Sequence, residues 1–476
     1  MSSSPPASDP LIVVFDTGKT NIKLSVARAD GQIVETLSLA NPTLEGPLWH
    51  YHDLSTISVW LLESLAQLVK RHDIASLVPV GHGAAGLLVT GDPDRNNGVA
   101  LPMIDYEQDL PTSIRDAYAA IAGSFHDRGS AMMLQATHQA RQLYWQEQIA
   151  PEAVAEAHCY LCLPQYWTWY LTGKAVSEYT MLSAQSHLWN AVEQRFADIV
   201  GNRDWTRLMP PIAPAWHRLG PLRAPLAKAI DSPREIDILV GGHDSSLNLY
   251  RYHAAGLTDV CLVSTGTWFV GMSTETPLEN IDEQRGMTLN SDVTGRVVGG
   301  ALIMGGREYA QVMGNNEGQE EVAADASVCE RLISRQTMAL PSFGDDDGLF
   351  PGSARRGVVI GPLPETSVET KTLAVLYSAL LTLECIDALG ASDLVVLDGT
   401  ALSDPLFATL VAALRPDGRT LYNRESYGVA AGAALLTEHE TRQKPAAITL
   451  ESPSTYTGDV DALRVYAERW KHRSRP

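Results

Sequence analysis

The stretch from Ile12 to Leu24, IVVFDTGKTNIKL, decides how the start of this chain folds. It contains Gly18-Lys19-Thr20, which are also the last three residues of a Walker A phosphate loop. That loop needs another glycine five positions before Gly18, and this chain has Val13 there, inside an apolar run. A second strand-like run follows the Thr-Gly turn. We therefore predict a β-hairpin rather than a strand-to-helix phosphate loop.

The hairpin belongs to a longer strand pattern. Asp30-Gly31 is a second hairpin signal, and apolar residues at helical spacing follow before another apolar run. We predict three consecutive strands, a helix and a fourth strand, at Leu11–Phe15, Ile22–Ala27, Gln32–Leu39, about Ser55–Arg71, and in the run that ends at Gly81.

The same order begins again in the second half of the chain. Ser264-Thr-Gly-Thr267 lies between two strand-like runs, as Asp16-Thr-Gly18 does. An internal repeat of this kind is what two stacked domains of one type leave in a sequence. The later segments predict α/β alternation, with a strand at Val297–Ile303, a helix at Val368–Leu389, a strand at Leu394–Leu397, a helix at Pro405–Leu414, a strand at Thr420–Tyr422 and a helix at Tyr427–Leu436.

The length of 476 residues also favours two domains, because single cores stop growing near about 250–300 residues. We place the boundary near Pro233. The predicted parts are a flexible N-terminus at residues 1–10, an N-terminal domain at 11–233, a C-terminal domain at 234–440 and a C-terminal extension at 441–476. Neither end reads as core, and the basic run Lys471–Arg475 reads as a solvated end.

The composition argues against several classes of protein. Thirty-six Lys and Arg against 56 Asp and Glu give a net charge of −20, which repels nucleic acid and anionic membranes. The first ten residues lack the pattern of a signal peptide, and no uncharged apolar run reaches membrane-spanning length. Five cysteines do not make a disulfide framework, and Cys159 and Cys162 read as buried thiols rather than a zinc site. We expect a cytoplasmic protein.

The two Thr-Gly turns are candidate phosphate sites. Each offers small residues, backbone N–H groups and hydroxyls, which together can cradle phosphate oxygens. Asp16 would then hold a hydrated Mg²⁺. A tight turn capped by Asp16 explains the first turn equally well, but the second tip, Ser264–Thr267, favours phosphate, since two tips can hold one nucleotide.

Asp244 is a candidate general base. It follows Gly241-Gly-His243 at the end of a predicted strand, Ile236–Val240, and opens a helix-like segment. Phosphoryl transfer to an alcohol needs a carboxylate near the accepting hydroxyl to take its proton. Asp at a helix start is also a common N-cap, and this segment alone favours the cap.

Taken together, these motifs resemble the FGGY carbohydrate kinases, of the actin and hexokinase fold superfamily. The resemblance covers nearly the whole chain, with the motifs in order. They are the first hairpin, Asp16–Lys23; Leu171-Thr-Gly173 followed by Glu178–Ala184; Gly241–Asp244; Ser264–Thr267; Asp398-Gly-Thr400; and the helix-like Glu425–Ala434.

The resemblance implies two ribonuclease H-like α/β domains with a cleft between them, and transfer of phosphate from ATP to a sugar hydroxyl. It makes Asp244 the general base and Asp16 the residue that orders Mg²⁺. ATP and Mg²⁺ are the implied cofactors. The implied ATP and phosphate contacts are Thr17, Gly18, Lys19, Thr20, Thr265, Gly266, Thr267, Gly399 and Thr400.

The chain departs from the family pattern in the segments that, by the resemblance, recognise the sugar. Xylulose kinases carry a Gln-Met-His segment where this chain has Gly81-His-Gly-Ala-Ala-Gly86, and a Trp-x-Asp-x-Arg loop where it has Leu101–Gln108. We expect His82, Asp105 and Glu107, together with Asp244, to contact the sugar hydroxyls, although an ordinary polar loop explains the first three nearly as well. Gly305-Gly-Arg307-Glu308 resembles a stretch of fuculose- and rhamnulose-type relatives, so Arg307 is a candidate contact for the sugar or a phosphate, or equally an ion-pair partner of the neighbours of Glu308.

Three readings of the function stay open at this point. The first is an ATP-dependent kinase for a ketose, a pentulose or hexulose. The second is an ATPase of the same superfamily that switches a partner protein, and the third is a kinase for a glycerol- or erythritol-type polyol. A sensor without activity is disfavoured because Asp16 and Asp244 are both present. We expect no nucleic acid or membrane partner, and a homodimer stays open.

Overall fold

The computed structural model describes residues 10–314, 322–390 and 393–475. Of the predicted flexible N-terminus at residues 1–10, residues 1–9 lie outside the described part. Contacts divide the chain into two compact units. The first unit holds residues 1–256, 290–297 and 427–447, and the second holds 257–289, 298–426 and 448–476.

The first unit is built on a seven-stranded sheet with the order β11-β12-β6-β1-β2-β3, and β13 also pairs with β6. β1, β2 and β3 form the predicted antiparallel meander, and β6 and β12 run parallel to β1. The strands are β1 (Leu11–Thr17), β2 (Asn21–Ala27), β3 (Ile33–Ala40), β6 (Ile74–Gly81), β11 (Arg218–Pro221), β12 (Asp237–Leu239) and β13 (Gly242–His243).

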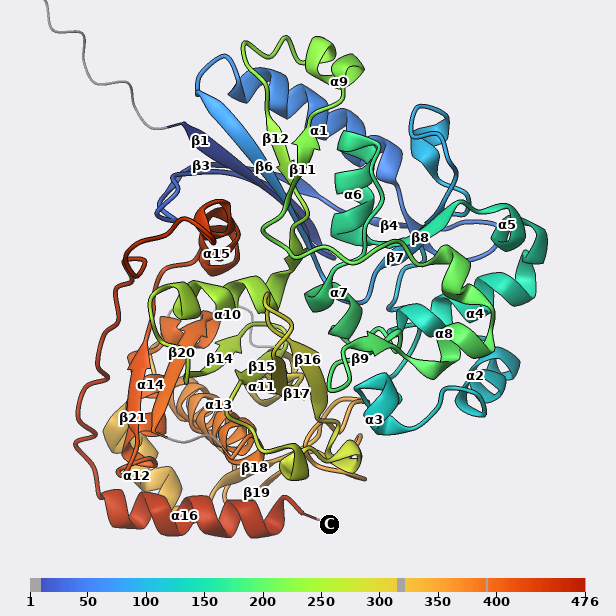
Figure 1. The fold of residues 1–476 in the computed structure, drawn as a ribbon. Helices are drawn as coiled ribbons and strands as arrows, with labels where there is room; N and C mark the ends of the chain where they lie inside the picture. Colours follow the sequence, from blue (N-terminus) through green and yellow to red (C-terminus); the bar gives the residue numbers. More distant parts are fainter. Residues whose placement is uncertain (1–9, 315–321, 391–392, 476) are drawn as a thin grey trace, which may run out of the picture. The chain divides into compact units, whose positions relative to one another are not determined.

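Helices cover both faces of this sheet (Figure 1). Val13 and Phe15 on β1 join a core with α1 and α6, whereas Ile12 and Val14 join a second core with α10 and α15. Alternation of this kind follows from the two-residue period of a strand, and it explains why β1 is apolar throughout. The helices are α1 (Leu54–Leu68), α6 (Leu163–Thr172), α10 (Asp244–Ala254) and α15 (Gly428–Leu435).

The rest of the first unit is made of shorter elements. The strands form three two-stranded sheets, namely β4 (Thr43–Leu44) with β5 (Tyr51–His52), β7 (Gly86–Val89) with β8 (Cys159–Cys162), and β9 (Trp189–Asn190) with β10 (Arg195–Phe196). The helices are α2 (Thr112–Ala119), α3 (Phe125–Arg128), α4 (Gln139–Ile149), α5 (Pro151–Glu156), α7 (Tyr179–Ser183), α8 (Asp198–Asn202) and α9 (Ala224–Ala229). The thiols of Cys159 and Cys162 are free and buried, as predicted.

The second unit repeats the first unit's strand order. Its sheet runs β16-β17-β15-β14-β20-β21, with β14, β15 and β17 as the antiparallel meander and β20 and β21 parallel to β14. The strands are β14 (Cys261–Thr265), β15 (Phe269–Ser273), β16 (Thr288–Ser291), β17 (Val297–Ile303), β20 (Leu394–Gly399) and β21 (Arg419–Tyr422), with a separate pair β18 (Met338–Leu340) and β19 (Val358–Ile360). The helices are α11 (Gly305–Met313), α12 (Ala326–Arg335), α13 (Ser367–Ala388), α14 (Pro405–Ala413) and α16 (Val460–Arg473).

The first unit extends past the predicted boundary near Pro233, to Gly256. The reason is that β13 adds to the first sheet beside β6, and α10 packs against α15 on one face of that sheet. Residues 234–256 therefore belong with the first sheet by their contacts.

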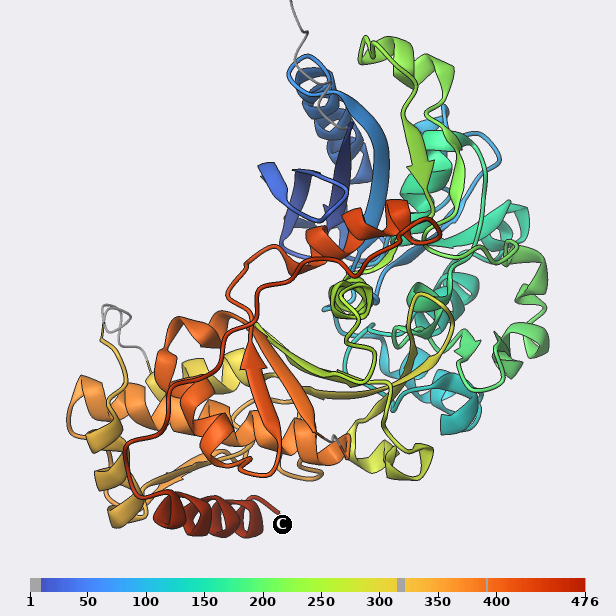
Figure 2. The ribbon, with the colours of Figure 1, turned by 60° about the vertical axis from the view of Figure 1, so that its left-hand side comes forward.

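The prediction that the C-terminal end lies outside the core is wrong. α16 lies beside α12 in the second unit (Figure 2). Leu463, Tyr466 and Trp470 are buried, and the Trp470 indole N–H donates to the Ala339 carbonyl at 2.6 Å. Lys471, read as part of a solvated end, forms an ion pair with Asp387.

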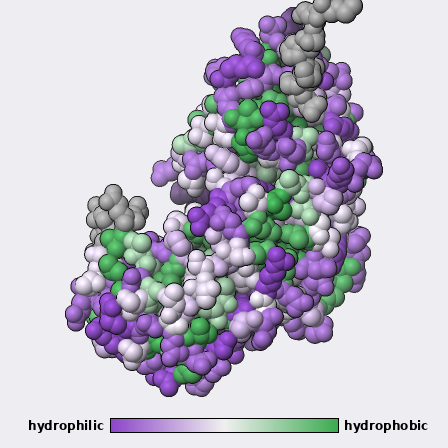
Figure 3. Space-filling model, turned by 90° about the vertical axis from the view of Figure 1, so that its left-hand side faces the viewer, coloured by the Kyte–Doolittle hydropathy of each residue, from purple (hydrophilic) through white to green (hydrophobic). Residues whose placement is uncertain are grey.

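The surface in Figure 3 is mostly hydrophilic, with hydrophobic residues in scattered groups. No helix in the described residues is both long enough and apolar enough to cross a membrane.

Candidate active site

The sheet of the first unit brings Asp16, His82 and Asp244 to one edge. β1 and β13 both pair in parallel with β6, on opposite sides of it. In this register Asp16 and Gly242 both lie opposite Val80, and Thr17 and His243 both lie opposite Gly81. The carboxyl ends of parallel strands are where α/β sheets usually place their ligands. The three predicted side chains therefore leave the sheet at the same edge.

Two carboxylates at this edge influence each other. The pKa of Asp16 is raised to about 7, mainly by burial and also by the negative charge of Asp244, while the charge of Lys23 opposes the shift. No hydrogen bond to the Asp16 carboxylate is formed within the described residues. A partly buried carboxylate with a like-charged neighbour fits a bound cation, because a cation stabilises the ionised form of both groups.

Protein side chains alone do not complete a cation site here. Across residues 10–314, 322–390 and 393–475, no group of three or more His, Cys, Asp or Glu side chains could hold a metal ion. Mg²⁺ is usually held by one or two carboxylates with waters and substrate phosphates. Asp16 fits that mode of binding.

Close backbone packing explains why two glycines precede His243 and Asp244. Gly241 has φ +67°, and a Cβ there would lie 1.8 Å from the Pro79 carbonyl oxygen. A Cβ on Gly242 would lie 2.7 Å from the Thr180 hydroxyl. Only glycine fits both positions, and this lets β13 join the sheet beside β6.

The Glu178 motif is linked by hydrogen bonds to the segment that carries His243 and Asp244. The Glu178 carboxylate caps α7 by accepting from the backbone N–H groups of Thr180 and Met181, and it accepts from the Thr180 hydroxyl at 2.6 Å. The Thr180 hydroxyl in turn accepts from the backbone N–H of His243 at 2.9 Å. Thus the motif found in the sequence positions the backbone that carries Asp244.

Asp244 is the first residue of α10, and its side chain is 29% exposed. Its carboxylate accepts from the backbone N–H and the hydroxyl of Ser245, and Oδ1 lies 3.2 Å from His243 Nε2. The His243 ring also contacts the Ser246 hydroxyl at 3.1 Å, and burial lowers the pKa of His243. Asp244 therefore stabilises the start of α10 while part of its side chain faces solvent.

The ring of His82 has an unusual environment for a partly buried histidine. Both ring nitrogens are buried, and neither has a hydrogen-bond partner within the described residues. Burial lowers the pKa of His82 to about 4, although the charge of Asp244 opposes the shift, so the ring is neutral at pH 7. A neutral imidazole offers one donor and one acceptor. An unpartnered donor and acceptor at the edge that holds Asp244 suit a polar ligand.

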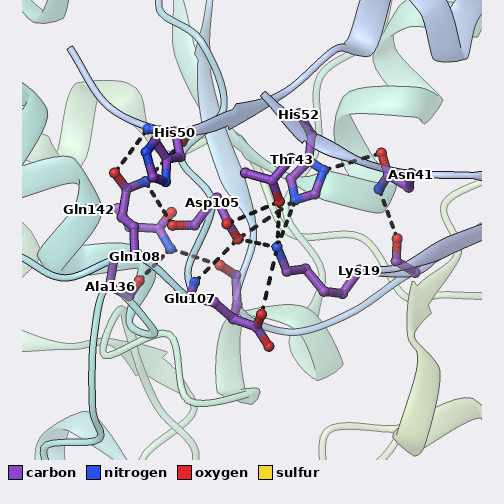
Figure 4. Close-up of polar contacts among 12 residues, drawn as sticks. Lys19, Asn41, Thr43, His50, His52, Asp105, Glu107, Gln108, Ala136 and Gln142 are labelled. Atoms are coloured by element: carbon purple, nitrogen blue, oxygen red, sulfur yellow. Dashed lines mark hydrogen bonds and ion pairs between the residues drawn. The ribbon is translucent and has the colours of Figure 1, made fainter. Parts of the chain in front are cut away.

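Lys19, Asp105 and Glu107 lie together in the first unit (Figure 4). The Lys19 ammonium pairs with Asp105 Oδ1, donates to the Thr43 hydroxyl at 2.9 Å and lies 3.9 Å from Glu107 Oε2. Burial would raise the pKa of Asp105, but its polar neighbours His52 and Lys19 hold that pKa well below its usual range. The sequence did not predict two of these partners, Thr43 on the short strand β4 and His52 on the short strand β5.

At the first hairpin tip, some polar groups are hydrogen-bonded within the described residues and others are not. The Gly18 N–H donates to the Asn21 carbonyl at 3.1 Å, and the buried Thr17 hydroxyl donates to the Val80 carbonyl at 2.7 Å. Within the described chain, the backbone N–H groups of Lys19 and Thr20 donate no hydrogen bond. These two N–H groups, with the exposed Thr20, remain able to bind an anion.

The second hairpin tip packs against the Asp398 motif within the second unit. The Thr265 hydroxyl donates to the Asp398 carbonyl at 2.7 Å and accepts from the Ala401 N–H at 3.1 Å. Gly399 has φ +92°, and a Cβ there would lie 2.0 Å from the Thr265 carbonyl oxygen. Thr267 is exposed. The two motifs, far apart in sequence, thus form one surface.

A cavity of about 380 Å³ lies at this surface of the second unit. Gly266 and Thr400 from the predicted nucleotide motifs line it, and its size is within the usual range for small-molecule pockets. Gly306, from the predicted Gly305–Glu308 motif, also lines it, and the other lining residues are Phe269, Tyr309, Lys371, Val375, Ser378, Ala401, Ser403, Asp404 and Phe407.

Arg307 and Glu308 lie in the first turn of α11 in the second unit. Arg307 is close enough to Asp346 for its charge to oppose the raised pKa of that carboxyl, which burial causes. Glu308 is buried and accepts from the Phe343 N–H at 2.8 Å and the Tyr377 hydroxyl at 2.6 Å. Glu308 is thus a structural residue.

Comparisons with known proteins show which family and fold the chain resembles. Residues 11–250 match the N-terminal domain of the FGGY family of carbohydrate kinases, and residues 257–445 match the C-terminal domain of carbohydrate kinase FGGY. The chain is 23% identical over 278 residues to L-fuculokinase of Escherichia coli strain K12, covering 55% of this chain and 56% of that protein. The chain therefore spans about half the length of the curated relatives that it matches.

Solved structures share the fold over nearly the whole chain. A carbohydrate kinase from Novosphingobium aromaticivorans has a TM-score of 0.86 at 28% identity, covering 97% of this chain and 100% of that one. A xylulose kinase from Lactobacillus acidophilus has a TM-score of 0.80 at 16% identity, covering 97% and 96%, which is a likeness of fold alone.

Proposed function

Because the chain belongs to the FGGY family of carbohydrate kinases, we propose that it transfers the γ-phosphate of ATP to a terminal hydroxyl of a ketose, a pentulose or hexulose. The observation that carries this proposal is the shared sheet edge in the first unit. There two carboxylates, Asp16 and Asp244, stand with the unpartnered ring of His82. This set supplies a cation ligand, a base and a polar contact for an alcohol.

Asp244 is the general base in this proposal. Its carboxylate takes the proton of the acceptor hydroxyl, the hydroxyl oxygen forms a bond to the γ-phosphorus, and the bond from that phosphorus to the β–γ bridging oxygen breaks, releasing ADP. The partial exposure of Asp244 and its place at a strand end suit this role. The matching Gly241-Gly-His-Asp244 segment in the family adds support.

Asp16 would hold Mg²⁺ together with ATP phosphates and water. The ion would neutralise negative charge on the transferring phosphoryl group. The raised pKa of Asp16 and its lack of a hydrogen-bond partner among the described residues support a cation ligand there. At the hairpin tip, we propose that phosphate oxygens are bound by Thr17-Gly18-Lys19-Thr20, through the free N–H groups of Lys19 and Thr20.

The second unit would bind the rest of the nucleotide. The cavity beside Gly266 and Thr400 is large enough for the nucleoside part of ATP, and the tip Thr265-Gly266-Thr267 with Gly399 offers phosphate contacts. Under this proposal the first unit supplies the base and most of the acceptor contacts, and the second unit supplies the contacts to the nucleoside.

The hydroxyl groups of the acceptor would be recognised by the side chains of His82, Asp105, Glu107 and Arg307. A site that hydrogen-bonds hydroxyl groups rejects epimers because its buried polar groups are then left unpaired. L-fuculose is the first acceptor to test, since L-fuculokinase is among the chain's relatives. A cytoplasmic location, expected from the free cysteines, and a homodimer remain predictions.

The test is ADP release by the purified full chain with ATP and Mg²⁺. The acceptor panel is L-fuculose, L-rhamnulose, D-xylulose, D-gluconate and glycerol, with a reaction lacking acceptor as the control. Release that a ketose stimulates at least tenfold is the expected result. Stimulation by glycerol alone would indicate the polyol kinase, and acceptor-independent release would indicate the partner-switching ATPase.

A further inference from the structure

We infer that the side chain of Lys19 serves the acceptor rather than ATP: it is a positioning residue that fixes Asp105 for an acceptor hydroxyl. This inference rests on the proposed kinase function. Lys19 lies on the hairpin tip whose backbone we assign to phosphate, so its sequence position suggests a phosphate contact. The contacts of its ammonium group point elsewhere.

All three hydrogens of the Lys19 ammonium have an acceptor in the first unit (Figure 4). One is directed to Asp105 Oδ1, one to the Thr43 hydroxyl at 2.9 Å and one to His52 Nε2 at 3.5 Å. An ammonium has three donors and no more. A bond from Lys19 Nζ to a phosphate would therefore break one of these contacts.

Asn41 orients the His52 ring and indicates its tautomer. Asn41 Nδ2 donates to the Gly18 carbonyl at 3.0 Å, which turns Asn41 Oδ1 toward His52 Nδ1 at 3.2 Å. His52 Nδ1 therefore carries the hydrogen. In this tautomer Nε2 faces Lys19 Nζ as an acceptor at 3.5 Å. Lys19 in turn pairs with Asp105.

The Asp105 carboxylate is fixed by the same contacts. Its Oδ1 faces Lys19 and also accepts from the Glu107 N–H at 3.2 Å, while its Oδ2 accepts from the Thr43 hydroxyl at 3.1 Å. The Asp105 side chain is 7% exposed and the Lys19 side chain is 17% exposed. A partly desolvated pair with satisfied hydrogen bonds holds its geometry far better than a surface ion pair.

The cluster also adjoins the other acceptor candidate. The rings of His82 and Tyr106 lie 5.3 Å apart, and Lys19 Nζ lies 5.7 Å from the centre of the Tyr106 ring. Tyr106 is the residue between Asp105 and Glu107. The polar groups around Lys19 are thus those assigned to the acceptor. An ionised, fixed carboxylate here accepts a hydrogen bond from a sugar hydroxyl, and it does so only while Lys19 holds it.

The test separates the two substrates of the enzyme. We compare wild type, Lys19→Met, Lys19→Arg and the exposed-lysine control Lys70→Met. Calorimetry measures binding of a nonhydrolysable Mg-ATP analogue, and ADP release measures KM for L-fuculose and for ATP. We expect Lys19→Met to raise the KM for L-fuculose about 10- to 100-fold, the value of a hydrogen bond to a charged group. Analogue affinity should stay within about threefold of wild type, and Lys19→Arg should recover part of the loss.

Thr43→Val is the second variant, because it removes a contact of both Lys19 and Asp105 without changing any charge. We expect it to raise the KM for L-fuculose in the same direction by a smaller factor. A loss of analogue affinity of tenfold or more in Lys19→Met, with the KM for L-fuculose unchanged, would overturn the inference and leave the kinase function intact. Wild type that releases no additional ADP with L-fuculose or any other acceptor of the panel would overturn the proposed function, and the inference with it.

Discussion

The two hairpin tips share one backbone design and differ in charge. In the first unit Thr17 lies opposite Gly81 of the neighbouring parallel strand, and its hydroxyl donates to the carbonyl one residue earlier, at 2.7 Å. In the second unit Thr265 lies opposite Gly399 and makes the same contact, also at 2.7 Å. The repeated Thr-Gly turn seen in the sequence thus reflects a repeated structural unit.

The residue before each threonine differs. The first tip has Asp16, whose pKa burial raises to about 7, and the second has Ser264, whose hydroxyl is bonded to the Asp398 carboxylate. The residue after the glycine of each tip differs as well: it is Lys19 in the first tip and Thr267 in the second. The same turn therefore carries a charged set in the first unit and hydroxyls in the second. Charge at a tip, rather than the turn itself, determines which tip could hold a cation.

The largest expected effect comes from exchanging the residue that distinguishes the tips. Asp16→Asn should reduce ADP release with ATP and acceptor by at least about 100-fold, because a pre-positioned charge group is lost. Ser264→Ala, at the matching position, should reduce it by less than about tenfold. Steady-state rates at varied Mg²⁺ measure both. Equal effects of the two variants would show that the tips are interchangeable.

The raised pKa of Asp16 adds a pH dependence to this comparison. Ionised Asp16 binds the cation, so Mg²⁺ affinity measured by calorimetry should increase from pH 6 to pH 8 through about 7. In the metal-free protein the pH acts in the opposite direction, because the contribution of Asp16 to the free energy of unfolding decreases as the pH rises. The folded-state pKa exceeds the usual 3.8, so this group's stabilising contribution is lost as pH rises toward 7. Asp16→Asn should therefore have a higher Tm than wild type at pH 8 without Mg²⁺, and a lower one would contradict the assigned shift.

The next effect concerns the glycines opposite the two threonines. Gly399→Ala should destabilise the protein by about 3 kcal/mol, because its φ is +92° and the new Cβ would lie 2.0 Å from a carbonyl oxygen. Gly81→Ala should cost about 1 kcal/mol, since its nearest neighbours would lie at 3.2 Å. Urea unfolding gives both values. The reverse order would show that the packing at the two tips differs from the structure.

The smallest effect separates the two threonine hydroxyls. Thr17→Val removes one hydrogen bond, whereas Thr265→Val removes two, because Thr265 also accepts from the Ala401 N–H. We expect losses of stability of about 1 kcal/mol and about 2 kcal/mol. Equal losses would mean that the bond to Ala401 contributes nothing.

The fold was largely predictable from local patterns. The meander Leu11–Thr17, Asn21–Ala27 and Ile33–Ala40 appears where alternation and turn residues predicted it, and so does the long helix Ser367–Ala388. The resemblance to the FGGY family is confirmed by the family matches. α16 was missed because its buried residues, Leu463, Tyr466 and Trp470, are few and lie among charged ones.

The site was predictable only where it follows from strand ends. Asp16 and Asp244 stand at the ends of strands that the sequence already indicated, and the parallel register brings them to one edge. The hydrogen-bond partners of Lys19 lie 24 to 86 positions away along the chain, on short strands and loops that carry little pattern. Residues lining the cavity of the second unit, such as Tyr309 and Lys371, likewise come together only through tertiary packing.

The central claim is that Asp244 takes the proton of a sugar hydroxyl, and phosphorus NMR of the complete reaction tests it most directly. With ATP, Mg²⁺ and the best acceptor of the panel, wild type should give a sugar phosphomonoester signal together with ADP. Asp244→Asn should lose that signal by about 10²- to 10⁴-fold, the usual contribution of a general base, while it still binds ATP. Inorganic phosphate as the only new product of wild type, or a full phosphomonoester signal from Asp244→Asn, would contradict the account.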